Sequence, residues 1–332
     1  MPAPQTHPYD DLTPDVVLDA LSQIGLEVDG RLTALNSYEN RVYLVHLEDG
    51  TAQVVKFYRP DRWTDAQIEE EHAFAEALAA AEVPVVSPRR IQGRTLHHHS
   101  GFAFSVSPRR GGRHPELDDP EVLEWIGRFL ARLHDVGTQS AFIQRPALNL
   151  SRMGHDPVEW LLTQSVIPPE VRTRWQQAAE AALGAIESVW KATPTGVLRL
   201  HGDCHPGNIL WTPTDTPGGG PHFVDLDDAC TGPAIQDLWM LLSGDRVQQQ
   251  HQLGLLLDGY ETMHAFNRRE LALIEPLRTL RIIHYSAWLA RRWNDPTFPI
   301  HFPWFGSSSY WLEQTQLLWD QIDAMEGKPL VA

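Results

Sequence analysis

The chain has 332 residues and a formal net charge of −16 at pH 7. A chain of this length can bury a large core and divides more naturally into two lobes than into one. An acidic balance without any basic stretch argues against a nucleic-acid partner, whereas a basic peptide or a cationic small molecule would be attracted.

The cellular compartment can be inferred from cysteines and apolar runs. Cys204 and Cys230 are the two cysteines, too few for a disulfide framework. Residues 1–11 are polar and lack the apolar segment of a secretory leader, and no apolar run reaches membrane length. We therefore expect a cytoplasmic protein without membrane contact. We also expect it to act as a monomer.

The N-terminal third alternates between helix and strand signals. Thr13 followed by Pro14 is typical of a helix start, and an apolar stripe then ends near Gly25. Short apolar runs rich in β-favouring residues predict strands over residues 32–35, 41–47, 53–58, 89–91 and 102–106. Residues 107–112 are expected to form a hinge that binds adenine, and helices are expected to dominate beyond it.

Lys56 stands in one of these strands among apolar neighbours. This setting is typical of the lysine that pairs with ATP phosphates in kinases. A helix is predicted to start at Thr64 and to run past a cluster of glutamates, one of which can hold Lys56.

Two stretches, residues 201–208 (HGDCHPGN) and 223–228 (FVDLDD), contain residues suited to phosphoryl transfer. Asp203 can accept the proton of an attacking hydroxyl, and Asn208 and Asp225 offer the oxygen ligands that Mg²⁺ prefers. The spacing of five residues between Asp203 and Asn208 is that of the kinase catalytic loop.

A hairpin is predicted between the two stretches. Residues 208–211 and 222–225 are short β-favouring runs, and residues 212–221 between them are turn formers. The hairpin would bring Asn208 and Asp225 to one end, and Asp227 could assist with a second ion. A zinc site built from His201, Asp203 and His205 is a weaker alternative, because it leaves Asn208 and Asp225 unexplained.

Four segments together resemble the aminoglycoside phosphotransferase and choline kinase superfamily: residues 36–43 (NSYENRVY), 54–60, 200–205 and 232–242. The resemblance implies an α+β, two-lobed protein-kinase-like fold. A small lobe over residues 1–107 would hold an antiparallel sheet plus a helix, and a larger, mostly helical lobe would cover residues 108–332.

The resemblance also assigns roles to single residues. It implies that Asp203 is the proton acceptor, that Asn208 and Asp225 bind Mg²⁺, and that Ser37 lies in the ATP-binding loop. It favours Glu71 over Glu70 as the partner of Lys56. Asp237 matches a buried aspartate that hydrogen-bonds the backbone of the catalytic loop.

The implied activity is that of an ATP- and Mg²⁺-dependent serine/threonine protein kinase in a bacterial stress response. Two alternatives stay open: a kinase of small amino alcohols or aminosugars, and a kinase-like protein that only binds a partner.

Three features depart from ordinary protein kinases. No G-x-G-x-x-G precedes Lys56, Asp227 replaces the glycine of D-F-G, and no long activation segment follows Asp225.

Three smaller features carry competing interpretations. Cys204 can be an oxidisable switch beside the base, but a small packing residue is the better interpretation. His97, His98 and His99 are expected in a β-turn. The loop that contains Trp304, together with residues 291–292, is hypothesised to border the acceptor site.

Overall fold

The computed structural model describes residues 7–331, which form two compact units. The first runs to His114 and adds Ile143–Arg145 and Gly207–Asp227; the second comprises Pro115–Phe142, Pro146–Pro206 and the chain from Asp228 onward. The predicted lobe boundary between residues 107 and 108 stays a prediction. The polar run of residues 1–11 lies partly outside the described residues.

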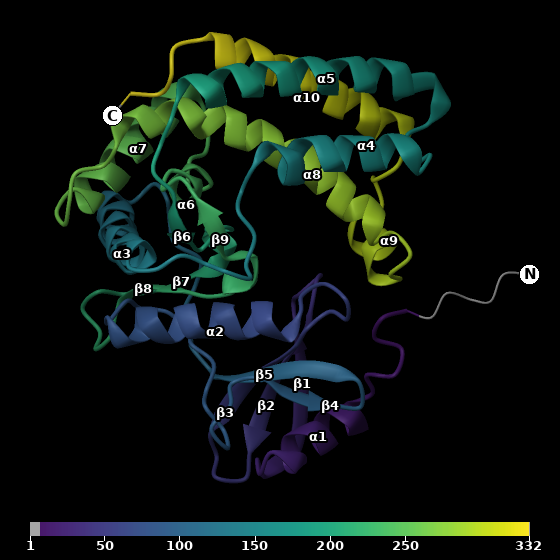
Figure 1. Cartoon of the computed structure of the whole chain (residues 1–332). Helices are drawn as coiled ribbons and strands as arrows, with labels where there is room; N and C mark the ends of the chain where they lie inside the picture. The colour runs from purple at the N-terminus through teal and green to yellow at the C-terminus, as the bar shows by residue number, and fades with distance from the viewer. Residues whose placement is uncertain (1–6, 332) are drawn as a thin grey trace, which may run out of the picture. The chain divides into compact units, whose positions relative to one another are not determined.

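The first unit is built on a five-stranded antiparallel sheet (Figure 1). Its strands, in the order β1-β2-β3-β5-β4, are β1 (Val28–Leu35), β2 (Arg41–Leu47), β3 (Ala52–Phe57), β5 (Phe102–Pro108) and β4 (His97–His99). The antiparallel sheet and the helices described below confirm the predicted fold class.

The edge strand β4 corrects two sequence-based expectations. No strand forms over residues 89–91, and the three histidines expected in a turn pair with β5 instead, His98 opposite Ala103. The turn lies one residue further along, at Ser100 and Gly101, which both have positive φ. The histidines lack the β-favouring apolar residues from which the other strands were predicted.

Two helices cover opposite faces of this sheet. Helix α1 (Pro14–Gln23) is capped by Thr13 and packs Val17 and Leu21 against Val55 and Phe57. Helix α2 (Asp65–Ala80) starts with a capping box formed by Thr64 and Gln67. It packs Ile68 against Ala103 of β5. Because side chains alternate along a strand, Ala103 and Lys56 point away from the face that α1 covers.

The predicted hairpin is present in the first unit. Strands β7 (Ile209–Thr212) and β8 (Gly220–Phe223) pair with Ile209 opposite Phe223. The Val224 N–H donates to the Asn208 carbonyl at 3.0 Å, which extends the pairing by one residue. The Phe223 N–H also donates to the Pro84 carbonyl at 2.8 Å, which connects the hairpin to the segment after α2.

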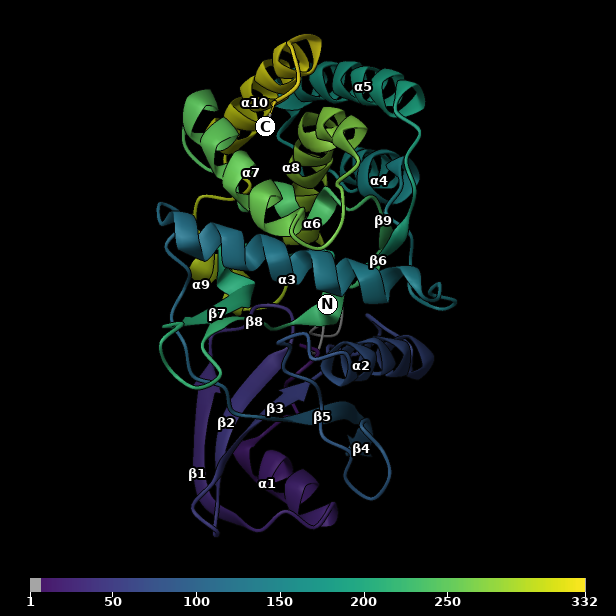
Figure 2. The same cartoon turned by 90° about the vertical axis from the view of Figure 1, so that its left-hand side faces the viewer.

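The second unit is mostly helical (Figure 2). Its elements are α3 (Pro120–Thr138), η1 (Ser151–His155), α4 (Asp156–Thr163), α5 (Pro169–Ala192), β6 (Leu198–Leu200), β9 (Cys230–Gly232), α6 (Gln236–Trp239), α7 (Arg246–Tyr260), η4 (Arg268–Leu273), α8 (Ile274–Arg291), α9 (Thr297–His301) and α10 (Ser308–Glu326). Two short 3₁₀ turns, η2 (Pro206–Asn208) and η3 (Leu226–Asp228), flank the hairpin.

The core of the second unit lies where α5, α8 and α10 meet. In both views α5 and α10 run side by side (Figures 1 and 2). Trp175 of α5 and Trp311 of α10 are fully buried and pack edge to face, with ring centroids 5.4 Å apart. Such buried aromatic pairs contribute strongly to a helical core.

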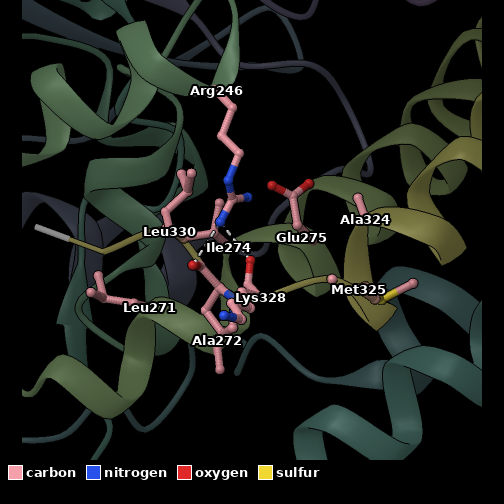
Figure 3. A pocket seen from close by; sticks show the side chains of 11 residues that line it. Arg246, Leu271, Ala272, Ile274, Glu275, Ala324, Met325, Lys328 and Leu330 are labelled. Carbon is pink, nitrogen blue, oxygen red and sulfur yellow. Dashed lines mark hydrogen bonds between the residues drawn. The ribbon is translucent and has the colours of Figure 1, made fainter.

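The C-terminal segment is fixed to the same unit beside a small pocket (Figure 3). Arg246 donates to the carbonyl oxygens of Lys328 and Pro329, at 2.6 and 2.8 Å. None of the residues that the sequence analysis proposed for catalysis lines this pocket.

Within residues 7–331, no helix combines the length and the apolar character needed to cross a bilayer.

Candidate active site

The loop that carries Asp203 follows β6 in the second unit and is held by Asp237. The Asp237 carboxylate accepts hydrogen bonds from the backbone N–H groups of His201 and Gly202, both at 2.8 Å. Asp237 is fully buried. The expected contact between this aspartate and the catalytic-loop backbone is therefore confirmed.

Asp237 is itself supported by a chain of buried polar groups. Its Oδ2 lies 3.2 Å from His134 Nε2, and His134 Nδ1 lies 2.9 Å from the Tyr260 hydroxyl. Gly202 has φ +85°, and a Cβ there would lie 2.1 Å from the Asp228 carbonyl oxygen. The loop geometry thus requires glycine at position 202.

Asp203 is surrounded by cationic and polar groups of the second unit. Its Oδ1 accepts from Arg281 Nη1 at 2.6 Å, and its Oδ2 lies 3.4 Å from His205 Nε2. Burial alone would raise the pKa of Asp203, but the His205 hydrogen bond and the Arg281 charge outweigh it and hold the pKa below its usual range. Asp203 is consequently ionised at neutral pH, as a proton acceptor must be.

His201 supports this loop from within. Its side chain is fully buried, and its Nδ1 accepts from the Asp203 backbone N–H at 3.4 Å. This contact agrees with a structural role for His201. Among residues 7–331 no three His, Cys, Asp or Glu side chains are grouped so that they could hold a metal ion.

In the first unit, Lys56 forms an ion pair with Asp225. Lys56 Nζ lies 2.6 Å from Asp225 Oδ1. Burial alone would lower the pKa of Lys56, but the carboxylates of Asp225 and Asp227 raise it well above its usual value. Asp225 has φ 61°, in the left-handed region. A strained backbone of this kind is common at functional sites.

The two candidate partners of Lys56 on α2 have different environments. Glu70 accepts the backbone N–H groups of Ile143, Gln144 and Arg145 at 2.6 to 2.8 Å. Glu71 is buried, and burial raises its pKa to about 7 although the Lys56 charge acts in the opposite direction. Glu71 Oε2 makes no hydrogen bond to a described residue. Pairing between Glu71 and Lys56 stays a prediction.

The proposed metal ligands lie at the same end of the β7–β8 hairpin. Asn208 directly precedes β7 and Asp225 follows two residues after β8, so the pairing of the strands brings the two positions together. An amide oxygen and a carboxylate are suited to a hard cation such as Mg²⁺.

Ser37, the residue expected in the ATP-binding loop, is half-buried in the bend between β1 and β2. No contact tests its role.

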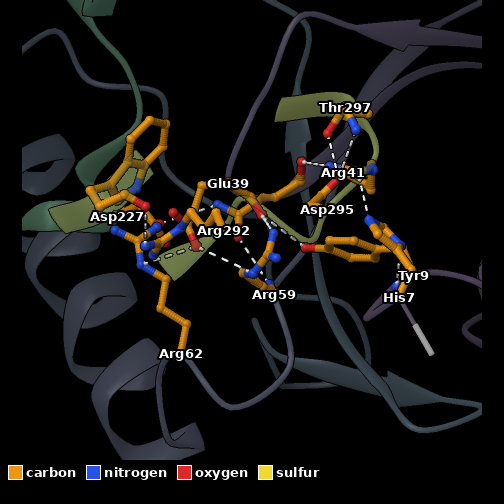
Figure 4. A network of polar contacts seen from close by, with 12 residues as sticks. His7, Tyr9, Glu39, Arg41, Arg59, Arg62, Asp227, Arg292, Asp295 and Thr297 are labelled. Atoms are coloured by element: carbon orange, nitrogen blue, oxygen red, sulfur yellow. Dashed lines mark hydrogen bonds and ion pairs between the residues drawn. The ribbon is translucent and has the colours of Figure 1, made fainter. Parts of the chain in front are cut away.

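Asp227 has a different environment from the one expected of a second metal ligand. It is buried, and its Oδ2 accepts from Arg62 (Figure 4). The same oxygen accepts from Asn40 Nδ2 at 3.2 Å. No local sequence pattern predicts these partners, because Asn40 lies 187 residues from Asp227 along the chain.

Arg281 is a site residue that the sequence analysis missed. We expect Arg281→Ala to move the acidic limb of the kcat/KM profile to higher pH, because loss of the guanidinium raises the pKa of Asp203. Protonated Asp203 cannot accept a proton, so activity would then fall at a higher pH than in the wild type.

Steady-state kinetics between pH 4 and 8 would measure this shift. Arg174→Ala, which removes an exposed arginine of α5, is the matched control and should leave the limb in place. An acidic limb at the same pH in Arg281→Ala and wild type would contradict the role assigned to Arg281.

The remaining sequence hypotheses can be placed as well. Cys204 is fully buried, and burial raises the pKa of its thiol well above the usual value, which favours the packing role. Trp304 is 45% exposed and packs against Phe302 and Tyr310, while Arg291 lies over the Trp160 ring. That these residues border the acceptor site stays a prediction.

Comparison with known proteins identifies the class. The profile described as "Phosphotransferase enzyme family" matches residues 31–274. "Stress response kinase A" of Escherichia coli O157:H7 is 47% identical over 97% of this chain and 96% of its own. "Serine/threonine protein kinase RdoA" of Salmonella typhimurium is 45% identical with the same coverage. The chain belongs to the phosphotransferase enzyme family.

A solved structure supports the same fold at low sequence identity. The structure described as "Amicoumacin kinase hAmiN in complex with AMP-PNP, Ca2+ and Ami" aligns with TM-score 0.70 and 17% identity. The alignment covers 96% of this chain and 94% of that one. The likeness confirms the kinase-like fold.

Proposed function

We propose that this protein transfers the γ-phosphoryl group of ATP to a serine or threonine hydroxyl of a protein. The observation that carries the proposal is the Asp203 carboxylate, which accepts a hydrogen bond from Arg281 on a loop whose backbone is held by Asp237. The names of relatives that share almost half of its residues support a protein as the acceptor.

Asp203 would accept the proton of the acceptor hydroxyl while the hydroxyl oxygen attacks the γ-phosphorus and ADP leaves. Asn208 lies five residues after Asp203. Because a fully extended chain spans at most about 3.6 Å per residue, the Cα atoms of Asp203 and Asn208 are at most about 18 Å apart. Lys56 would contact the α- and β-phosphates, with Glu71 orienting it, and the segment containing Ser37 would cover the phosphates.

Asn208 and Asp225 would hold Mg²⁺ through their side-chain oxygens. When bound, the ion neutralises the charge that develops on the phosphate oxygens. The alternative acceptor, a small amino alcohol or aminosugar, is supported by the kinase-like neighbour described as an amicoumacin kinase. A role limited to binding a partner has no need for Lys56, Asp203, Asn208 and Asp225 together.

The proposal is tested by incubating the purified protein and its Asp203→Ala variant with γ-labelled ATP and Mg²⁺. Mass spectrometry of the protein and of a generic basic protein substrate then identifies any modified residue. We expect phosphoserine or phosphothreonine with the wild type and none with the variant. ATP turnover without labelled protein would indicate a small-molecule acceptor, and no turnover would reject the enzymatic function.

A further inference from the structure

Asp227 lies two residues after Asp225, at the position where kinases with a D-F-G motif have glycine. Its carboxylate accepts hydrogen bonds from other residues of the first unit. Arg62 and Asn40 both donate to Oδ2, and the backbone carbonyl accepts from Arg145 Nη2. The side chain is 3% exposed. A carboxylate in such surroundings is stabilised only if its donors stay in place.

Asn40 links this carboxylate to the segment that the proposed function assigns to ATP. We call residues 37–40 the nucleotide loop. Asn40 is 3% exposed; its Nδ2 donates to Asp227, and its Oδ1 accepts the Arg59 N–H at 3.0 Å. One buried amide therefore connects the end of the nucleotide loop, the residues after β3 and the segment of Asp225.

The neighbouring residue of the loop is tied into the same network. Glu39 Oε1 lies 3.8 Å from both Arg59 Nε and Arg62 Nε, and the Glu39 carbonyl accepts from the Tyr9 hydroxyl at 3.2 Å (Figure 4). The loop has no glycine and is followed directly by β2. Its C-terminal end is consequently fixed by side chains rather than by a special backbone conformation.

We propose that Asp227 is the anchor of the nucleotide loop: its bond to Asn40 positions the loop for ATP, and Asp227 is not a metal ligand. The proposal rests on the proposed function only in assigning the loop to ATP. Oδ2 already receives a guanidinium and an amide, and a divalent cation there would repel Arg62. Oδ1, which has no hydrogen-bond partner among the described residues, is the atom on which the rival metal role depends.

A swap of the two side chains tests the bond. Asn40→Asp places a second carboxylate against that of Asp227. Asp227→Asn removes the negative charge to which Asn40 and Arg62 donate. Each is expected to weaken ATP binding about tenfold, the usual effect of losing one charge-assisted hydrogen bond. The double variant restores the amide–carboxylate pair in reverse but leaves Arg62 facing an amide at position 227, so its Kd for ATP should lie closer to the wild-type value than that of either single variant.

Calorimetry in EDTA and in Mg²⁺ separates the two roles. An anchor affects ATP affinity in both buffers, whereas a metal ligand affects it only in Mg²⁺ and is not restored by the swap. Asp215→Asn, an exposed aspartate in the β7–β8 turn, is the charge-matched control. Circular dichroism checks folding, and Asn40→Ala carries the same test if Asp227→Asn does not fold.

Equal ATP affinity of the wild type and both single variants in EDTA would overturn the anchor. So would single-variant losses that the swap does not reverse. A wild type that binds no ATP in either buffer would instead reject the proposed function, so the two failures are distinguishable.

Discussion

Asp203→Asn is expected to lower kcat about 1,000-fold, because an amide cannot accept the proton of the acceptor hydroxyl. The substitution keeps the size of the side chain and an oxygen that can still accept from Arg281. Loss of the loop conformation should therefore not contribute. Affinity for ATP should stay within about threefold of wild type, since the change concerns the acceptor side of the reaction.

Rapid-quench measurement of phosphoryl transfer at saturating ATP and acceptor would give kcat, and calorimetry would give the ATP affinity. The Arg174→Ala variant serves again as a control for handling and assay. A decrease of less than tenfold in kcat would reject Asp203 as the base.

Asp237→Asn is expected to lower the free energy of unfolding by about 3 kcal/mol, because it replaces an acceptor-only group with one that places an NH₂ against backbone donors. One of the two N–H groups, of His201 or Gly202, would lose its partner in a fully buried place. The catalytic loop would lose its fixed conformation, and activity should fall with stability.

Differential scanning calorimetry would show this loss as a decrease of roughly 6 to 12 °C in Tm. Asp258→Asn, on the exposed side of α7, removes the same charge without touching a buried network and should leave Tm within about 1 °C. An unchanged Tm for Asp237→Asn would mean that the carboxylate charge does not hold the loop.

Local sequence signals were sufficient for much of the fold. The strands β2 and β3 are short runs rich in β-favouring apolar residues, and the caps at Thr13 and Thr64 mark the helix starts. β4 was missed because its three histidines are not a β-favouring apolar run. Its pairing depends on β5 and on the turn at Ser100 and Gly101, which a local pattern does not reveal.

Site residues could be predicted where their type and spacing in the sequence indicate their role. They could not be predicted where the contact depends on how distant helices pack. Asp237 was expected to hydrogen-bond the backbone of the loop that carries Asp203, and it does. Arg281 reaches Asp203 across 78 residues of sequence, a contact that depends on where α8 packs. Glu70 and Glu71 differ by one position, and a helix turns about 100° per residue, so only the packed helix separates their environments.

The left-handed backbone at Asp225 has a consequence for protein engineering. A side chain other than glycine in that conformation costs about 1 kcal/mol. A glycine at position 225 would remove this cost, but it would also remove the carboxylate that lies 2.6 Å from the Lys56 Nζ. Libraries screened for heat resistance alone are therefore expected to keep an acidic residue at position 225, because its ion pair with Lys56 outweighs the cost of the backbone conformation.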